Sequence, residues 1–175
     1  MKIEIRNRYT YEVIFTYDCE DNTIKKTVEE AVRKHVSLSC SNMSGSNMSG
    51  SDMSGSDMSG IKTSGTTAFF SLCCPPEGSF IAFKKANNKI VKLLITEDAK
   101  RSSATSLRCR ASKAKVLSIE SIDKTETFKS VKSNYNSNFI YKVGETVEVT
   151  DFDENRWTEC STGIHFFISR MNAEQ

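Results

Sequence analysis

Residues 36–65 read VSLSC SNMSG SNMSG SDMSG SDMSG IKTSG, so one five-residue pattern recurs without interruption. The central residues of the successive units are Leu38, Met43, Met48, Met53, Met58 and Thr63. A small serine stands two places before each methionine. A period of five matches neither an α-helix, with about 3.6 residues per turn, nor a strand, whose side chains alternate. A strict short repeat instead predicts a solenoid, in which each unit stacks on its neighbours.

The alternative interpretation of this segment is a flexible linker. It contains Gly45, Gly50, Gly55, Gly60 and Gly65, and a Gly/Ser-rich composition is typical of linkers. Linkers rarely place large apolar residues at regular intervals, so the methionines favour the solenoid. The segment is too short to bury a core alone, and we therefore expect flanking elements to cap both ends.

The residues before the repeat predict a hairpin and a helix. Residues 2–19 alternate between apolar and polar, with a turn near Asn7-Arg8, which indicates a β-hairpin. A helix is expected from Asn22 to His35, and His35 is interpreted as its C-terminal cap. Its apolar face comprises Ile24, Val28, Ala31, Val32 and His35. At the other end of the repeat, Phe69 and Phe70 are expected to cover the last coil.

A domain boundary is predicted near residue 76, after Cys73-Cys74-Pro75-Pro76. This divides the chain into residues 1–76 and residues 77–175. Strand-like runs follow at 79–83, 90–95, 114–119, 139–141, 146–149 and 164–168, with short helices expected at 98–106 and after Ser169 and an exposed loop at 123–138. The predicted fold class is therefore mainly β (α+β), with a small, mostly antiparallel β domain after the solenoid.

The composition sets few limits on function. The net charge of +2 argues neither for nor against nucleic acid. The chain has no long apolar run and no signal peptide, so we expect a cytoplasmic protein with no membrane partner. The cysteines lack CxxC spacing, and we interpret them as reduced thiols, with Cys40 at a corner where the other units have glycine. No cofactor and no metal site are expected.

The first candidate binding segment runs from Asp98 to Lys113 and is rich in cations and hydroxyl groups. Arginine binds phosphate through two parallel hydrogen bonds, and hydroxyl groups can supply further donors. The candidate ligand-binding residues here are Lys100, Arg101, Ser102, Ser103, Arg108 and Arg110. The alternative interpretation is a solvated basic surface strand, as most charge runs are.

The second candidate segment is the acidic and aromatic stretch 151–167. Its acidic residues begin like a calcium loop, but Arg156 and Thr162 stand where that loop needs glycine and glutamate, so calcium is not expected. Cys160 and His165 could act as a nucleophile and a base, although a turn entering a buried strand favours a structural role. Trp157 could stack on a base, and Trp157 and His165 complete the candidate ligand-binding set.

The repeat and the strings GSFIAFKK, CRASKAKVLSI and DFDENRWTECSTGIHFF resemble pentapeptide-repeat proteins of phages and gut-bacterial mobile elements that carry a C-terminal domain of unknown function. This resemblance implies a right-handed quadrilateral β-helix with four pentapeptides per coil. The central apolar residue and the small residue two places before it would then point inward. Cys160 to His165 match a Cys-Ser-x-Gly-aliphatic-His string of such phage domains.

These observations predict a non-enzymatic binding protein with no catalytic residue. Its C-terminal domain would bind an anionic small molecule, such as a nucleotide signal, or a nucleic acid, and so counter host defence. One alternative is a protein–protein inhibitor that uses the solenoid face against a host protein. Another is a nucleotide-processing enzyme that uses Cys160 and His165. Assembly into a homo-oligomer is a further expectation.

Overall fold

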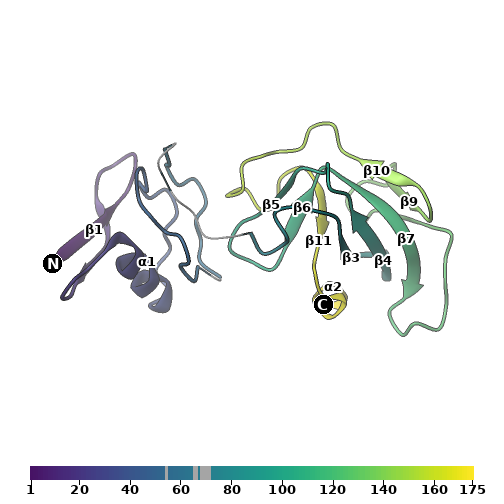
Figure 1. Cartoon of the computed structure of the whole chain (residues 1–175), viewed down its shortest axis with the longest axis horizontal. Coiled ribbons are helices and arrows are strands. Elements are labelled where there is room, and N and C mark those ends of the chain that lie inside the picture. Colours follow the sequence, from purple (N-terminus) through teal and green to yellow (C-terminus); the bar gives the residue numbers. More distant parts are fainter. Residues whose placement is uncertain (54, 65–66, 68–71) are drawn as a thin grey trace. The chain divides into compact units, whose positions relative to one another are not determined.

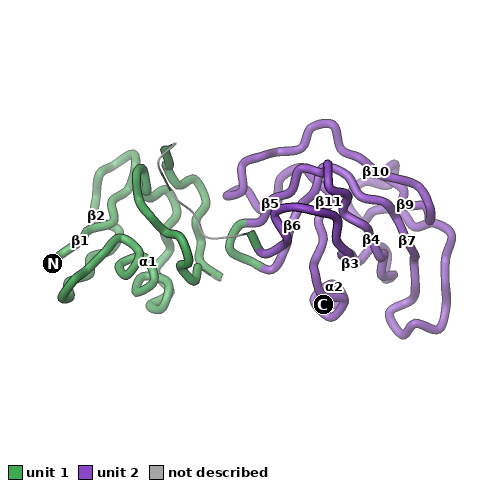
Figure 2. Tube along the Cα trace, in the orientation of Figure 1, with its two compact units in different colours: residues 1–72, 104–106 green, residues 73–103, 107–175 purple. Residues whose placement is uncertain are grey.

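The computed structural model describes residues 1–53, 55–64, 67 and 72–175, which form two compact units (Figures 1 and 2). Unit 1 comprises residues 1–72 and 104–106, and unit 2 comprises residues 73–103 and 107–175. The described residues are mainly β, with short helices, several small antiparallel sheets and no closed barrel.

Unit 1 begins with the predicted hairpin and helix. Strands β1 (Lys2–Arg6) and β2 (Val13–Asp18) pair antiparallel, and helix α1 spans Ile24–Arg33. The side chain of Thr23 caps the helix by accepting a hydrogen bond from the backbone N–H of Lys26. The C-cap residue is Lys34 and not His35, the residue that the sequence predicted; His35 follows it with a φ of 56° and redirects the chain.

The repeat forms a backbone ladder with itself. The N–H of Cys40 donates to the carbonyl of Ser59 at 2.8 Å, and the N–H of Met43 donates to the carbonyl of Lys62 at 2.8 Å. In both pairs the acceptor lies four repeats further along the chain, and Asn42 and Lys62 form a parallel bridge. Such regular pairing belongs to stacked coils and not to a flexible linker.

The central residue is buried in the first five units, whereas Thr63 of the sixth unit is exposed. Leu38, Met43, Met48, Met53 and Met58 are each no more than 3% exposed. Of the serines two places before the methionines, Ser41, Ser46 and Ser51 are also buried. The inward placement is therefore confirmed for these residues, and it makes this segment a narrow core of thioethers and small side chains.

Each of the first five units turns at a residue with positive φ. Gly45, Gly50, Gly55 and Gly60 have φ between 63° and 73°, and Cys40 takes the same corner with a φ of 56°. Glycine enters this region without steric cost, which explains its recurrence at the fifth position. Cys40 occupies the glycine corner that the sequence predicted for it.

The inward serines fall into two groups by their hydrogen bonds. The hydroxyls of Ser46 and Ser56 donate to the carbonyls of Met43 and Met53 at 2.7 and 2.8 Å. The buried hydroxyls of Ser41 and Ser51 have no hydrogen-bond partner within the described chain. A buried hydroxyl without a partner lowers stability, whereas a bonded one raises it.

This difference predicts opposite outcomes for two chemically identical substitutions. Ser46→Ala should lower the free energy of unfolding by about 1 kcal/mol, because it removes a buried hydrogen bond. Ser51→Ala should leave stability unchanged or raise it by up to about 1 kcal/mol, because it removes an unpaired hydroxyl. Urea denaturation of both variants tests this expectation, and an equal loss of stability would contradict it.

Residues 104–106 complete unit 1. The N–H of Gly55 donates to the carbonyl of Thr105 at 3.0 Å, and the hydroxyl of Thr105 donates to the carbonyl of Ser56 at 2.5 Å. These bonds satisfy backbone groups at a repeat corner, so this segment supplies capping contacts that the sequence did not predict. Phe69 and Phe70, to which that role was assigned, lie outside the described residues.

Unit 2 contains a four-stranded sheet, a three-stranded sheet and a hairpin. The four-stranded sheet has the order β10 (Thr146–Glu148), β7 (Lys113–Ser121), β4 (Lys89–Ile95) and β3 (Phe80–Ala86). The three-stranded sheet has the order β11 (Ile164–Phe166), β6 (Cys109–Ala111) and β5 (Arg101–Ser103). The hairpin is β8 (Ser130–Lys132) with β9 (Ile140–Lys142), and helix α2 spans Arg170–Glu174.

Two details of unit 2 differ from the sequence predictions. The expected helix at 98–106 is absent, because residues 101–103 form strand β5 and pair with β6. The expected loop at 123–138 contains strand β8. Both strands have only three residues, too few to show an alternating pattern, and their partners come from elsewhere in the chain.

The larger and smaller sheets of unit 2 are connected twice. Strands β6 and β7 are consecutive and separated only by Ser112. At the other side, Phe83 and Phe167 exchange backbone hydrogen bonds of 2.8 Å, which join the edge of β3 to the residue after β11. These connections place residues of β3 close to β11, where the candidate site lies.

Candidate functional site

Most of the candidate ligand-binding residues predicted from the sequence lie in the three-stranded sheet. Across it, His165 of β11 pairs with Arg110 of β6, and Arg110 pairs with Ser102 of β5. The basic segment and the acidic-aromatic segment therefore meet in one sheet, although about fifty residues separate them in the chain. Each side chain, however, has a different environment.

The guanidinium of Arg101 is surrounded by backbone carbonyls. Its nitrogens donate to the carbonyl oxygens of Pro75, Gly78, Thr96, Glu97 and Ala99 at 2.8–3.2 Å. It also lies 5.3 Å from the ring of Phe80. Arg101 therefore joins the loop before β3 to the loop after β4.

Arg110 organises the acidic-aromatic loop in the same way. It is 3% exposed, and its guanidinium donates to the carbonyls of Asp153, Asn155 and Thr162 at 2.7–2.9 Å. The loop comes so close that a Cβ on Gly163 would lie 3.1 Å from Cβ of Arg110. Glycine at 163 is thus required by this close approach and by its φ of 148°.

The remaining nominated residues are divided between the interior and the surface. Ser103 is buried and accepts a 2.8 Å hydrogen bond from the N–H of Cys73, while the buried hydroxyl of Ser102 has no partner within the described residues. Lys100 is exposed and forms an ion pair with Glu154. Trp157 is partly buried, and the guanidinium of Arg156 lies 4.9 Å from its ring.

The structure adds Lys84 of β3, which the sequence did not nominate. Lys84 lies on the buried face of its strand between Ala82 and Ala86, and only 9% of it is exposed. Its ammonium donates to the carbonyl of His165 at 3.3 Å and lies 5.7 Å from the ring of Tyr141. No carboxylate pairs with Lys84 in the part of the chain that the structure describes.

The electrostatics of this region reflect burial and like charges. Burial and, to a smaller extent, the positive charge of Arg108 together lower the pKa of Lys84 to about 8. Burial also lowers the pKa of His165, helped by the charges of Lys84, Arg108 and Arg110 and opposed by the bond to Ser161. The cations around His165 thus disfavour one another, and an anion would relieve that repulsion.

Cys160 and His165 make separate contacts. His165 Nε2 lies 2.9 Å from the carbonyl oxygen of Ser161, which can only accept, so the contact requires a proton on Nε2. Cys160 is exposed, and Arg108 Nη1 lies 3.9 Å from its sulfur. In these contacts the imidazole nitrogen is occupied by a backbone carbonyl, not by the thiol.

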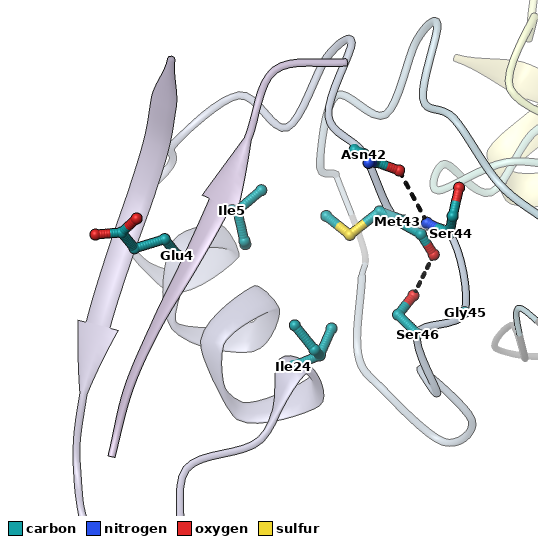
Figure 3. A pocket seen from close by; sticks show the side chains of 8 residues that line it. All are labelled: Glu4, Ile5, Ile24, Asn42, Met43, Ser44, Gly45 and Ser46. Carbon is teal, nitrogen blue, oxygen red and sulfur yellow. Dashed lines mark hydrogen bonds between the residues drawn. The ribbon is translucent and has the colours of Figure 1, made fainter. Parts of the chain in front are cut away.

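Two hollows lie in unit 1, and none of the candidate ligand-binding residues lines them. One cavity of about 120 Å³ has Ile5 and Ile24 on one side and Met43 and Ser46 on the other (Figure 3). A shallower depression of about 240 Å³ lies between Tyr17 and the polar face of α1. Among the described residues, no cluster of His, Cys, Asp or Glu could hold a metal ion.

These features define a mainly β protein with a pentapeptide unit and a second β unit that carries clustered cations. The family model described as a family of unknown function (DUF5758) matches residues 70–173, and the model for pentapeptide repeats (8 copies) matches residues 34–62. The chain therefore belongs to the DUF5758 family and contains pentapeptide repeats. No curated protein and no solved structure matches it. Neither described helix has the length and hydropathy needed to span a membrane.

Proposed function

We propose that the protein is a non-enzymatic binding protein whose unit 2 takes a phosphate-bearing ligand, such as a nucleotide, at Lys84, Arg108 and His165. The observation that carries this proposal is the ammonium of Lys84. It is almost completely buried, has a single carbonyl acceptor and has no ion-pair partner among the described residues.

A charge in this position is costly without a counter-ion. A pKa of about 8 instead of 10.5 means that keeping Lys84 charged in the fold at neutral pH costs about 3 kcal/mol. Buried lysines of this kind are normally paired. An oxyanion beside Lys84 would supply the missing negative charge. It would also accept hydrogen bonds from the ammonium N–H groups that do not bind the His165 carbonyl.

The other nominated residues have supporting roles in this proposal. Arg101 and Arg110 hold the loops around the site, because their guanidinium donors already bind backbone carbonyls. Lys100 and Trp157 would contact the part of the ligand beyond its phosphate. Ser102 and Ser103 lie in the strand that supports them.

The proposal also includes the coil geometry of unit 1 and the origin, action and location of the protein. The ladder between positions four repeats apart supports a right-handed quadrilateral β-helix in unit 1, which would serve as a rigid spacer. Origin in a phage or gut-bacterial mobile element, action against host defence and a cytoplasmic location are predictions of the sequence resemblance.

The test combines binding with stability in one substitution. Lys84→Met should abolish binding of inorganic phosphate and of nucleoside phosphates, while raising the free energy of unfolding at pH 7 by about 3 kcal/mol. Lys115→Met, at an exposed position of β7, is the matched control and should change neither quantity. Calorimetry with phosphate, nucleotides and short single-stranded DNA measures binding, and urea denaturation measures stability.

The pH dependence of the same two proteins gives an internal check. Between about pH 8 and 10.5 the unfolded chain holds the Lys84 proton and the folded chain does not, so the stability of the native protein rises with pH. The advantage of Lys84→Met should therefore be complete below pH 8 and vanish above 10.5. If the native protein binds none of the anions, the proposed ligand class is wrong and a protein partner is favoured.

A further inference from the structure

Unit 2 contains a group of cysteines that the proposed ligand site does not use. Cys73 is exposed, Cys74 is 3% exposed and Cys109 is completely buried. All are free thiols. They lie where the chain enters unit 2 and where strand β6 begins.

Hydrogen bonds to side chains of β5 hold the segment that contains Cys74 beside the strand pair that contains Cys109. The N–H of Cys73 donates to the hydroxyl of Ser103 at 2.8 Å, and Ser103 is the direct partner of Cys109 in the β5–β6 ladder. Arg101, two residues before Ser103, donates to the carbonyl of Pro75 on the other side of Cys74. Segment 73–75 is thus held on both sides of Cys74 beside the β5–β6 pair that contains Cys109, and each of the two thiols shifts the pKa of the other.

We infer that Cys74 and Cys109 are a redox-active pair that closes to a reversible disulfide when the protein meets a small two-electron oxidant such as a peroxide. The bond would fasten the segment after Cys73 to strand β6. This inference goes beyond the proposed function and does not depend on it.

The electrostatics assign different roles to the two thiols. The neighbouring Cys109 thiol lowers the pKa of Cys74, and the positive charges of Arg101 and Arg156 act in the same direction against the effect of burial. The neighbouring Cys74 thiol and burial raise the pKa of Cys109, whose thiol donates to the carbonyl of Leu107 at 3.8 Å. Cys74 is therefore the thiol that ionises first and attacks the oxidant.

The reaction balances with peroxide as the only co-reactant. The Cys74 thiolate attacks one peroxide oxygen, the O–O bond breaks, and Cys74 becomes a sulfenic acid while hydroxide leaves. Cys109 then loses its proton and attacks the Cys74 sulfur, so the S–S bond forms and the second hydroxide leaves. Two thiols and one peroxide thus give one disulfide and two waters, and a thiol reductant reverses the change.

The experiment uses the full chain, reduced and then treated with hydrogen peroxide. We expect an intact mass lower by two hydrogens, a Cys74–Cys109 cross-link in non-reducing peptide maps, and a higher melting temperature that dithiothreitol reverses. Cys74→Ser and Cys109→Ser should each abolish the cross-link. Cys73→Ser and Cys160→Ser, which alter the exposed thiols, are the matched controls and should retain it.

Two results would overturn the inference. One is a native protein that gains only oxygen at Cys73 or Cys160 and forms no cross-link. The other is a cross-link that survives Cys74→Ser but disappears in Cys73→Ser, which would assign the chemistry to the exposed neighbour. Circular dichroism of each reduced variant shows whether it has folded, and Cys74→Ala provides an apolar replacement if serine is not tolerated.

Discussion

Replacing Met48 by aspartate is expected to unfold unit 1 under conditions in which the native protein is stable. Met48 is completely buried at the centre of the repeat, with Met43 and Met53 of the neighbouring units also buried. The substitution removes the packing of a large side chain and places a carboxyl among thioethers and small residues. The two effects together should cost about 4 kcal/mol or more, a large fraction of the stability of a small domain.

Two controls separate burial from charge in this experiment. Met48→Leu keeps an apolar side chain of similar size and should cost less than about 1.5 kcal/mol. Asn47→Asp places the same charge on the adjacent exposed residue, a position where other units already have Asp52 and Asp57, and should have little effect. A Met48→Asp variant that melts like the native protein would show that the repeat is not a packed core.

Replacing Arg110 by alanine is expected to be the most damaging change in unit 2. The substitution removes three charge-assisted hydrogen bonds and leaves the carbonyls of Asp153, Asn155 and Thr162 to find other donors. The loss should be about 3–5 kcal/mol, measured by urea denaturation, because partly buried acceptors would be left unpaired. The loop between Asp151 and Gly163 should then become sensitive to proteolysis.

A lysine at position 110 separates the effect of the guanidinium geometry from that of the positive charge. Arg110→Lys keeps the charge but cannot direct donors to three carbonyls at once, so it should recover only a small part of the stability. The exposed Lys115 serves as the surface control, and Lys115→Ala should change stability by less than about 0.5 kcal/mol. If Arg110→Ala is as stable as the control, the carbonyl contacts do not hold the loop.

Arg110 and Lys84 show how burial assigns different roles to cations of one unit. The three carbonyls around Arg110 satisfy a guanidinium without a second charge, so this arginine is a structural element. The ammonium of Lys84 donates to a single carbonyl, so its other N–H groups can donate to an anion. At Lys84 the buried charge is costly in free energy, and the ammonium still has N–H donors without an acceptor. For that reason the proposed ligand site is centred on Lys84 and not on Arg101 or Arg110.

The repeat shows how much of the fold can be predicted from the sequence. The strict period of five predicted a solenoid, and the resemblance to pentapeptide-repeat proteins implied the inward methionines and small serines. The hairpin of residues 2–19 and helix α1 were likewise predicted, because alternation and helical spacing are local patterns. The part of the fold determined by short-range periodicity is therefore the part that the sequence by itself determined.

Only the tertiary structure decided the roles of the charged residues in unit 2. The sequence brought Arg101, Arg108 and Arg110 to attention, but whether a guanidinium binds a ligand or a carbonyl depends on loops up to fifty residues away. Lys84 directly follows the predicted strand 79–83, and nothing in FIAFKKA shows that the register of β3 turns this side chain inward. Strands as short as β5 and β6 carry no periodic signal, and their pairing arises from long-range contacts. The sequence thus determined the local geometry. The burial and the hydrogen-bond partners of each charged side chain set the free energy of its charge, and both depend on the packing of distant segments.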